Sequence, residues 1–228
     1  MISRFRWYRV KFPNGYHFFS DSIRDANISV DRENGFHIVN ESNEEIDFKF
    51  YWRSKLVATN IDVDGNAAYH EISTLSDQDV TLTNFESGCL LRLNNPNRNF
   101  RELFNAMEKI VGMGFSIKPL SVSSSEVDSI LSRMDVSKLN RIRLSGSLKE
   151  NEIVARIELA AKEGIELSKV KLLDDVKYNS ESASYELMFK GVKGSLSYSS
   201  TGLVKISGEL SSYILHLLED TIKIRFFS

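Results

Sequence analysis

Three short segments of the same kind carry the chain's clearest candidate binding chemistry. Each reads apolar–basic–apolar, as a strand, and the three are Leu91-Arg92-Leu93, Ile142-Arg143-Leu144 and Val204-Lys205-Ile206. Successive side chains of a strand point to opposite faces, so the apolar residues predict a covered face and the basic ones an open face. If the strands share a sheet, the cations form a stripe that could follow a phosphate backbone or an acidic protein partner. An ordinary solvated sheet face explains the same pattern.

The N-terminal segment mixes cations with aromatic rings. Arg4, Arg6 and Arg9 alternate with aromatic residues between positions 4 and 9. This mixture suits single-stranded nucleic acid, because bases stack on rings while guanidinium groups hold phosphates. It suits equally well an edge strand whose arginines discourage unwanted pairing.

Acidic residues offer only incomplete metal sites. The run from Asp62 to Asn66 resembles the start of a calcium loop, but the later ligands of such a loop are missing. An Asp-Gly pair at its centre is more simply a hairpin turn. Asp47, with Lys49 two residues later and Asp31 upstream, gives a weak hypothesis of a metal-dependent nuclease or hydrolase. We therefore predict no catalytic residue, no metal site and no cofactor.

The composition of the chain argues against disulfide-bonded, zinc-thiolate, membrane-spanning and secreted proteins. The chain has 228 residues, a formal net charge of −2, 42% hydrophobic and 26% charged residues, which is ordinary for a globular protein. With Cys89 as its single cysteine it cannot form an internal disulfide or a thiolate zinc site. No stretch approaches the roughly 20 apolar residues that span a bilayer, and no signal peptide is recognisable. We expect a cytoplasmic protein that does not bind membranes.

The N-terminal part is predicted to be rich in antiparallel strands. Three turn signals separate the expected strands: Asn14-Gly15, Asn34-Gly35 and Asp64-Gly65. The expected strands cover residues 5–12, 16–19, 28–30, 36–39, 46–57 and 67–72. In the longest of them, Ile46, Phe48, Phe50 and Trp52 share one side.

The C-terminal part is predicted to be mixed, with about four amphipathic helices on an antiparallel sheet. Helices are expected over residues 100–111, after a capping box formed by Ser123 and Glu126, over 150–162, and over 210–218, with a last strand at 222–227. From residue 139 onward this order is compatible with a split β-α-β arrangement. The predicted class is α+β, with a β-rich subdomain over residues 1–120 and an α+β subdomain over 121–228, or one single unit.

The function that these features favour is non-catalytic. No paired acid and base, metal cluster or nucleophile motif stands out, so we expect a binding or accessory subunit that acts on a protein partner or as a homo-oligomer. The alternative is a nucleic-acid-binding protein that uses Arg92, Arg143 and Lys205, or the N-terminal arginines. A metal-dependent hydrolase with carboxylates near Asp47 and Asp62 is a third hypothesis.

Overall fold

The computed structural model describes residues 1–28, 32–61, 64–65, 67–148, 153–173 and 177–227. In this part of the chain it has four α-helices together with β-strands in mainly antiparallel pairs, which confirms the α+β class. The chain divides into two compact units. The first unit is Tyr8–Lys118, and the second unit is Met1–Trp7 together with Pro119–Ser228.

The strands of the first unit follow one another in space almost as they do in sequence. They are β2 (Asn34–Glu41), β3 (Glu45–Ile61), β4 (Ala67–Phe85), β5 (Gly88–Asn94) and the later part of β1 (Ile2–Lys11), in the order β2-β3-β4-β5-β1. The predicted strand at 46–57 lies inside β3, and its four named apolar residues are all buried, as expected. The turn predicted at Asp64-Gly65 lies between β3 and β4, where Gly65 has a φ of 83°.

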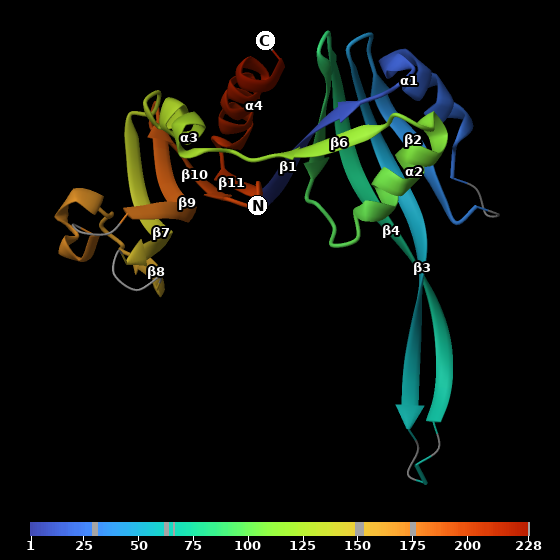
Figure 1. Ribbon diagram of the computed structural model, residues 1–228, viewed down its shortest axis with the longest axis horizontal. Helices are drawn as coiled ribbons and strands as arrows, with labels where there is room; N and C mark the ends of the chain where they lie inside the picture. Colours follow the sequence, from blue (N-terminus) through green and yellow to red (C-terminus); the bar gives the residue numbers. More distant parts are fainter. Residues whose placement is uncertain (29–31, 62–63, 66, 149–152, 174–176, 228) are drawn as a thin grey trace. The chain divides into compact units, whose positions relative to one another are not determined.

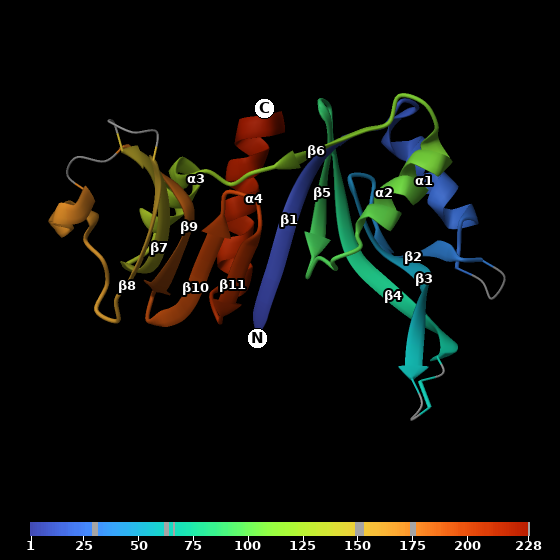
Figure 2. The ribbon, with the colours of Figure 1, turned by 60° about the horizontal axis from the view of Figure 1, so that its bottom comes forward.

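Two helices contribute to the core of the first unit (Figures 1 and 2). Phe19 and Ile23 of α1 (Gly15–Asp25), and Leu103 and Met107 of α2 (Arg101–Val111), are fully buried in one cluster with the aromatic side chains of β2 and β3. The ring of Phe36 lies 5.0 Å from that of Phe50, centroid to centroid. The helix predicted at 100–111 is therefore confirmed.

Two of the predicted turns are wrong. Asn14-Gly15 starts α1 and not a hairpin, because Tyr16, Phe19, Ser20 and Ile23 recur at the helical spacing and bury one helix face. Asn34-Gly35 lies inside β2, where a Cβ on Gly35 would come within 2.5 Å of the backbone of Ile28. That glycine is needed for a close approach of two backbones, not for a turn.

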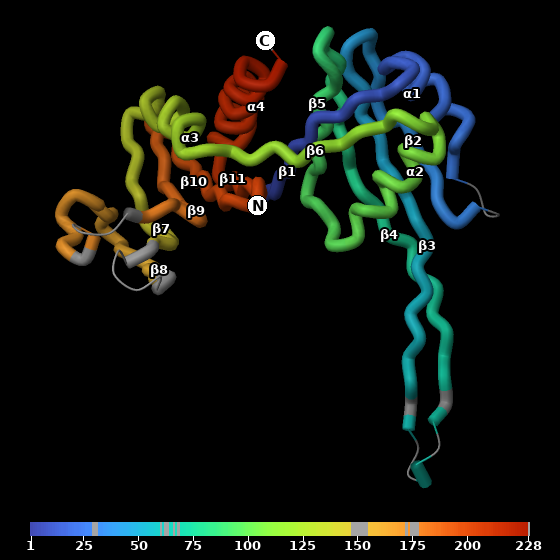
Figure 3. Tube along the Cα trace, in the orientation of Figure 1, coloured from blue at the N-terminus to red at the C-terminus, as the bar shows by residue number. Residues whose placement is uncertain are grey.

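Strands β3 and β4 continue beyond the rest of the first unit as a two-stranded arm. We define the arm as residues 54–61 of β3 and 67–75 of β4. Residues 54–61 face residues 67–74 in antiparallel register, and Leu75 faces Arg53 at the base of the arm. The pairing of β2 with β3 reaches only Trp52, and that of β5 with β4 only Asp79. Figure 1 shows the arm projecting from its unit, and Figure 3 follows the chain out along β3 and back along β4. At about 3.4 Å per residue the arm is about 27 Å long.

The second unit is built on a further set of strands. They are the early part of β1, β7 (Val136–Leu148), β8 (Ile153–Ala160), β9 (Lys177–Phe189), β10 (Val192–Ser199) and β11 (Val204–Gly208), in the order β1-β11-β10-β9-β7-β8. Strand β6 (Ser116–Leu120) pairs with β1, and two short 3-10 helices, η1 (Leu167–Lys169) and η2 (Lys171–Leu173), follow β8.

Two α-helices complete the second unit. The capping box predicted at Ser123 and Glu126 begins α3 (Ser124–Leu131). Glu126 is 4% exposed and accepts a hydrogen bond of 2.7 Å from Nη1 of Arg225, which belongs to α4 (Ser211–Phe227). This ion pair, with a buried carboxylate and a half-exposed guanidinium group, joins α3 to α4.

Two elements predicted in this unit are wrong. The helix expected over 150–162 is not formed, because Ile153–Ala160 is strand β8, paired with β7. The last strand expected at 222–227 is also not formed, because α4 continues through Phe227 with Ile222 buried on it. Within the described residues no α-helix lies between β7 and β11, so the order differs from that of a split β-α-β arrangement.

Candidate interaction surfaces

One polar face of the second unit gathers hydroxyl and basic side chains from five strands. We call it the serine–arginine face; it consists of Arg4, Arg141, Arg143, Ser182, Ser184, Ser197, Ser199 and Lys205. Strand register defines the face. Residues paired in one row across the strands are Arg4, Lys205, Ser197, Ser184 and Arg141. The neighbouring row is Phe5, Val204, Tyr198, Ala183 and Ile142, and all of these are buried. Because side chains alternate along a strand, the polar row points away from the buried one.

The serine–arginine face is hollowed. A depression of about 300 Å³ is lined by Arg141, Arg143, Ser182, Ser184, Ser197 and Lys205. The short serines come from the middle strands β9 and β10, and the long cations come from β7 on one side and β11 on the other. The hydroxyls of Ser184 and Ser197 lie 2.8 Å apart. Small residues between long ones give the depression a hydroxyl floor and basic walls.

Glu158 on β8 fixes the two arginines of this wall. Its carboxylate accepts from Nε of Arg143 at 2.8 Å and pairs with Nε of Arg141 at 3.0 Å. The hydrogen bond from Arg143 lowers the pKa of Glu158, so the carboxylate remains charged at neutral pH. Each contact uses only Nε, and the terminal nitrogens of both guanidinium groups can donate to another acceptor.

The structure brings some of the sequence-predicted cations together and separates others. Arg143 and Lys205 line the same depression, and Arg4 is the direct partner of Lys205 in the register of β1 and β11. Arg6 lies two residues farther along β1, in the same unit. Arg92 belongs to the first unit, where it donates to Asn94 Oδ1 and to Thr81 Oγ1, both at 2.9 Å.

Arg9 also lies in the first unit, where its Nη2 donates to the carbonyl oxygen of Ser87 at 2.9 Å. The N-terminal arginines are therefore divided between the units, with Arg4 and Arg6 in one and Arg9 in the other.

Arg141 and the serines of β9 and β10 were not predicted as site residues from the sequence. Arg141 precedes Ile142 and Arg143, so it shares the parity of Arg143 along β7. Ser182 and Ser184 alternate with the buried Ala183 in the same way. Strict alternation was the signal that could have found them, but only the pairing of β7 with β9 places them side by side.

The arm is the second candidate surface, and it is unusually apolar for an exposed element. Its exposed large hydrophobic residues, with 47–71% of their surface exposed, are Leu56, Val57, Ile61, Tyr69, Ile72 and Leu75. Leu56 lies directly opposite Ile72 on one face of the arm, while Val57 and Tyr69 belong to the other face. Both faces therefore present apolar side chains.

The carboxylates of the metal hypothesis have partners within the sheet of the first unit. Asp47 accepts a hydrogen bond of 2.6 Å from Thr81, and Lys49 lies 3.1 Å from Asp79, whose hydrogen bond raises the pKa of Lys49. Asp31 and Asp62 lie outside the described residues. Among the residues that are described, no group of three or more His, Cys, Asp or Glu side chains could hold a metal ion.

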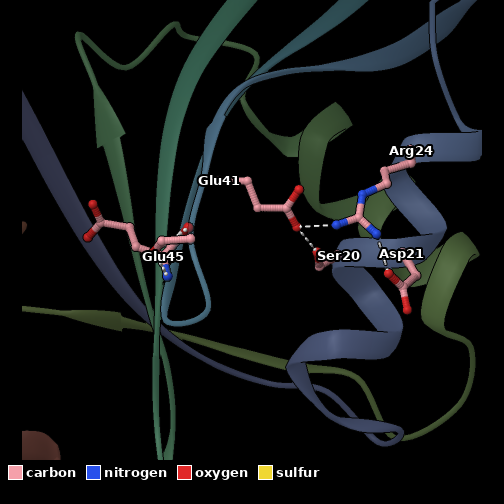
Figure 4. A network of polar contacts seen from close by, with 6 residues as sticks. Ser20, Asp21, Arg24, Glu41 and Glu45 are labelled. Carbon is pink, nitrogen blue, oxygen red and sulfur yellow. Dashed lines mark hydrogen bonds and ion pairs between the residues drawn. The ribbon is translucent and has the colours of Figure 1, made fainter.

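A polar network joins α1 to the end of β2 (Figure 4). Glu41 accepts from Ser20 at 2.5 Å and from Arg24 at 2.6 Å, and Arg24 also pairs with Asp21. The hydrogen bond from Arg24 lowers the pKa of Glu41. On the strand that follows, the backbone N–H of Glu45 donates to Oγ of Ser42 at 3.0 Å. The carbonyl oxygen of Glu45 accepts from the backbone N–H of Ser42 at 2.7 Å. Ser20, Arg24 and Glu41 bind one another, and these contacts tie α1 to β2.

No family model and no curated protein sequence matches this chain. Among the helices of the described residues, none has the length and apolar character needed to cross a membrane. The function is therefore inferred from the geometry of the two surfaces.

Proposed function

We propose that this protein is a non-catalytic, cytoplasmic accessory subunit that binds a protein partner through the arm. The observation that carries the proposal is the set of exposed apolar residues on both faces of the arm, with Leu56 opposite Ile72. Contiguous exposed apolar surface marks protein interfaces more often than it is left to water. A two-stranded hairpin is marginally stable by itself in water, so a partner that covers it also stabilises it.

The arm also supports a specific mode of binding. Beyond the ends of β2 and β5, the described residues of β3 and β4 pair only with each other, so both edges of the arm present backbone groups to the solvent. An added strand from a partner could satisfy these groups, while pockets in the partner receive the apolar side chains. The partner that fits is a protein with an apolar groove and an accessible strand.

The test uses two exposed residues of the arm and a matched control. Leu56→Thr with Ile72→Thr retains strand preference and removes apolar surface. The control is Val39→Thr in β2. Val39 is 60% exposed, as Leu56 is in the arm, so the control removes apolar surface of similar exposure. Each protein is purified from its source cells with nuclease treatment, and a photo-crosslinking residue is placed at position 56 or position 39.

We expect one protein to crosslink at position 56 and not at position 39. The yield of that protein co-purified without crosslinking should fall at least tenfold in the double variant and should match the wild type in Val39→Thr. A crosslink to a second copy of the chain would assign the arm to homo-oligomer formation. Equal crosslinking at positions 56 and 39, or equal yields from the wild type and the double variant, would contradict the proposal.

A further inference from the structure

We infer that the serine–arginine face of the second unit binds the phosphate backbone of a nucleic acid, without contacts to the bases. This site lies apart from the arm in sequence and belongs to the other unit. The inference goes beyond the proposed function and does not depend on it.

The side chains of the face suit phosphate oxygens. Arg141 and Arg143 form one wall of the depression and Lys205 the other, with serine hydroxyls between them. Phosphate accepts hydrogen bonds from all three groups, and guanidinium nitrogens match its geometry especially well. Glu158 holds both arginines in place, so little side-chain entropy is lost when an anion binds.

The spacing of the cations favours a chain of phosphates over a single one. Lys205, Ser197, Ser184 and Arg141 are successive partners across four adjacent strands. Strands lie about 4.8 Å apart, so the backbones at Lys205 and Arg141 are about 14 Å apart. One phosphate cannot contact both walls closely, whereas a polymer that crosses the strands contacts them in turn.

Among the cations that line the depression and the carboxylate that pairs with them, positive charge exceeds negative charge, and Glu186, farther along β9 on the same side, faces Lys138. Glu158 is shared by Arg141 and Arg143, so one negative charge faces two positive ones. Lys205 has no ion-pair partner within the described ranges and is exposed.

The side chains of the face also limit what can be recognised. The residues that define it include no aromatic ring, and Tyr198, which also lines the depression, is 6% exposed in the buried row. Exposed rings are the usual platform for unstacked bases. Binding through phosphates alone is independent of sequence and sensitive to salt. A duplex, which presents its phosphates outward, is the form that such a face suits best.

The experiment measures fluorescence anisotropy with a labelled 20-base-pair DNA duplex, the same single strand, and an RNA duplex. The test variant is Arg143→Gln with Lys205→Gln. The control variant is Arg133→Gln with Lys109→Gln, which removes the same charge from exposed positions outside the face. Competition with inorganic phosphate distinguishes a polymer site from a site for one phosphate group.

For the wild type at 50 mM salt we expect binding to duplexes in preference to the single strand, with weak competition by inorganic phosphate. The test variant should lose at least tenfold in affinity, and its slope of log affinity against log salt should fall by about two, since each lost phosphate contact removes about one. The control variant should match the wild type.

Equal affinities of the test and control variants, or no binding by the wild type, would overturn the inference. If the double variant fails to fold by circular dichroism, Lys205→Gln alone replaces it, because that exposed side chain forms no ion pair among the described residues. The arm variant Leu56→Thr with Ile72→Thr should bind DNA normally, so failure of this inference and failure of the proposed function are told apart.

Discussion

Cys89 is surrounded by protein and remains a neutral thiol. It is 3% exposed in β5, and its Sγ lies 3.6 Å from Oδ1 of Asn84. Burial raises the pKa of the Cys89 thiol from 9.0 to about 12. A thiolate is the reactive form of cysteine, so this residue acts as a packing residue at neutral pH.

This shift predicts a loss of stability at alkaline pH. Above about pH 9 the unfolded thiol releases its proton while the folded thiol keeps it, so the stability present below pH 9 falls as the pH rises toward 12. Cys89 contributes at most about 1.4 kcal/mol per pH unit to this slope. Urea unfolding at pH 8, 9.5 and 10.5 should show a shallower slope for Cys89→Ala than for the wild type.

Tyr16 and Tyr185 respond in the same direction, because burial raises the pKa of each to about 12. Both tyrosines remain in the wild type and in Cys89→Ala, so the difference between the two slopes reports the cysteine together with its effect on the pKa of Tyr16. Parallel slopes would mean that the thiol ionises equally in the folded and unfolded chains.

The alternation of apolar and basic residues along single strands was enough to predict part of the candidate site. It placed Arg143 and Lys205 on the faces opposite their apolar neighbours, and both side chains are exposed beside buried ones. It could not tell that Arg92 belongs to another unit, because strand pairing between distant residues leaves no trace in a three-residue pattern. The serine floor was overlooked for the same reason.

At the scale of elements, the arm enlarges the surface of the first unit without contributing to the core that stabilises it. The buried residues of β3 end at Trp52, and every described side chain from 69 to 75 is exposed. The core cluster of this unit contains none of the arm residues whose side chains are described. The arm therefore adds surface for binding and little to the core.

Removing the arm should leave the first unit stable. Replacing residues 54–74 by Asn-Gly joins Arg53 to Leu75, which already face each other in register, through a favoured two-residue turn. We expect the free energy of unfolding to change by no more than about 0.5 kcal/mol, as for surface changes in general. Urea unfolding followed by circular dichroism measures this change.

The matched comparison is Phe48→Ala, which removes a core ring that is 1% exposed and should cost about 3–5 kcal/mol. A loss of that size after removal of the arm would show that the arm supports the core.

Elements with strong local signals could be predicted from sequence, and those decided by distant pairing could not. The capping box of α3 is a local signal, because the side chain of each of Ser123 and Glu126 accepts a hydrogen bond from the backbone N–H of the other. Strand β8 has no such signal, since Arg156 and Glu158 alternate with apolar residues that also fit a helix. Its pairing with β7 decides the outcome.

At the scale of the whole molecule, the units divide the sequence unevenly. The second unit takes Met1–Trp7 from one end of the chain and Pro119–Ser228 from the other. Ile2–Phe5 pair with β11, and Trp7, 1% exposed, donates to Glu219 of α4 at 3.3 Å. Phe5 and Trp7 are thus part of the core of the second unit.

Each unit contains one of the two tryptophans, so the unfolding of each can be followed separately. Trp7 lies in the second unit and Trp52 in the first. In a Trp52→Phe background, Phe5→Ala should destabilise the unit that Trp7 reports by about 3–5 kcal/mol, because Phe5 is 8% exposed and its ring stacks on Trp7.

Fluorescence during urea unfolding measures this loss. Ile2→Ala, at a position that is 65% exposed on the same strand, is the control and should cost little. An unchanged midpoint for Phe5→Ala would show that the N-terminal strand is dispensable.

Because β1 is shared in this way, the order of synthesis matters for the second unit. Residues 8–118 leave the ribosome as a complete set, but Phe5 and Trp7 must wait for β11, which is made about 200 residues after them. At about 5–20 residues per second, this wait lasts roughly 10–40 s. During that time Phe5 and Trp7 lack β11 and α4, the neighbours that are made last. A newly made chain therefore passes through a stage in which two large aromatic side chains of its first strand are not yet buried.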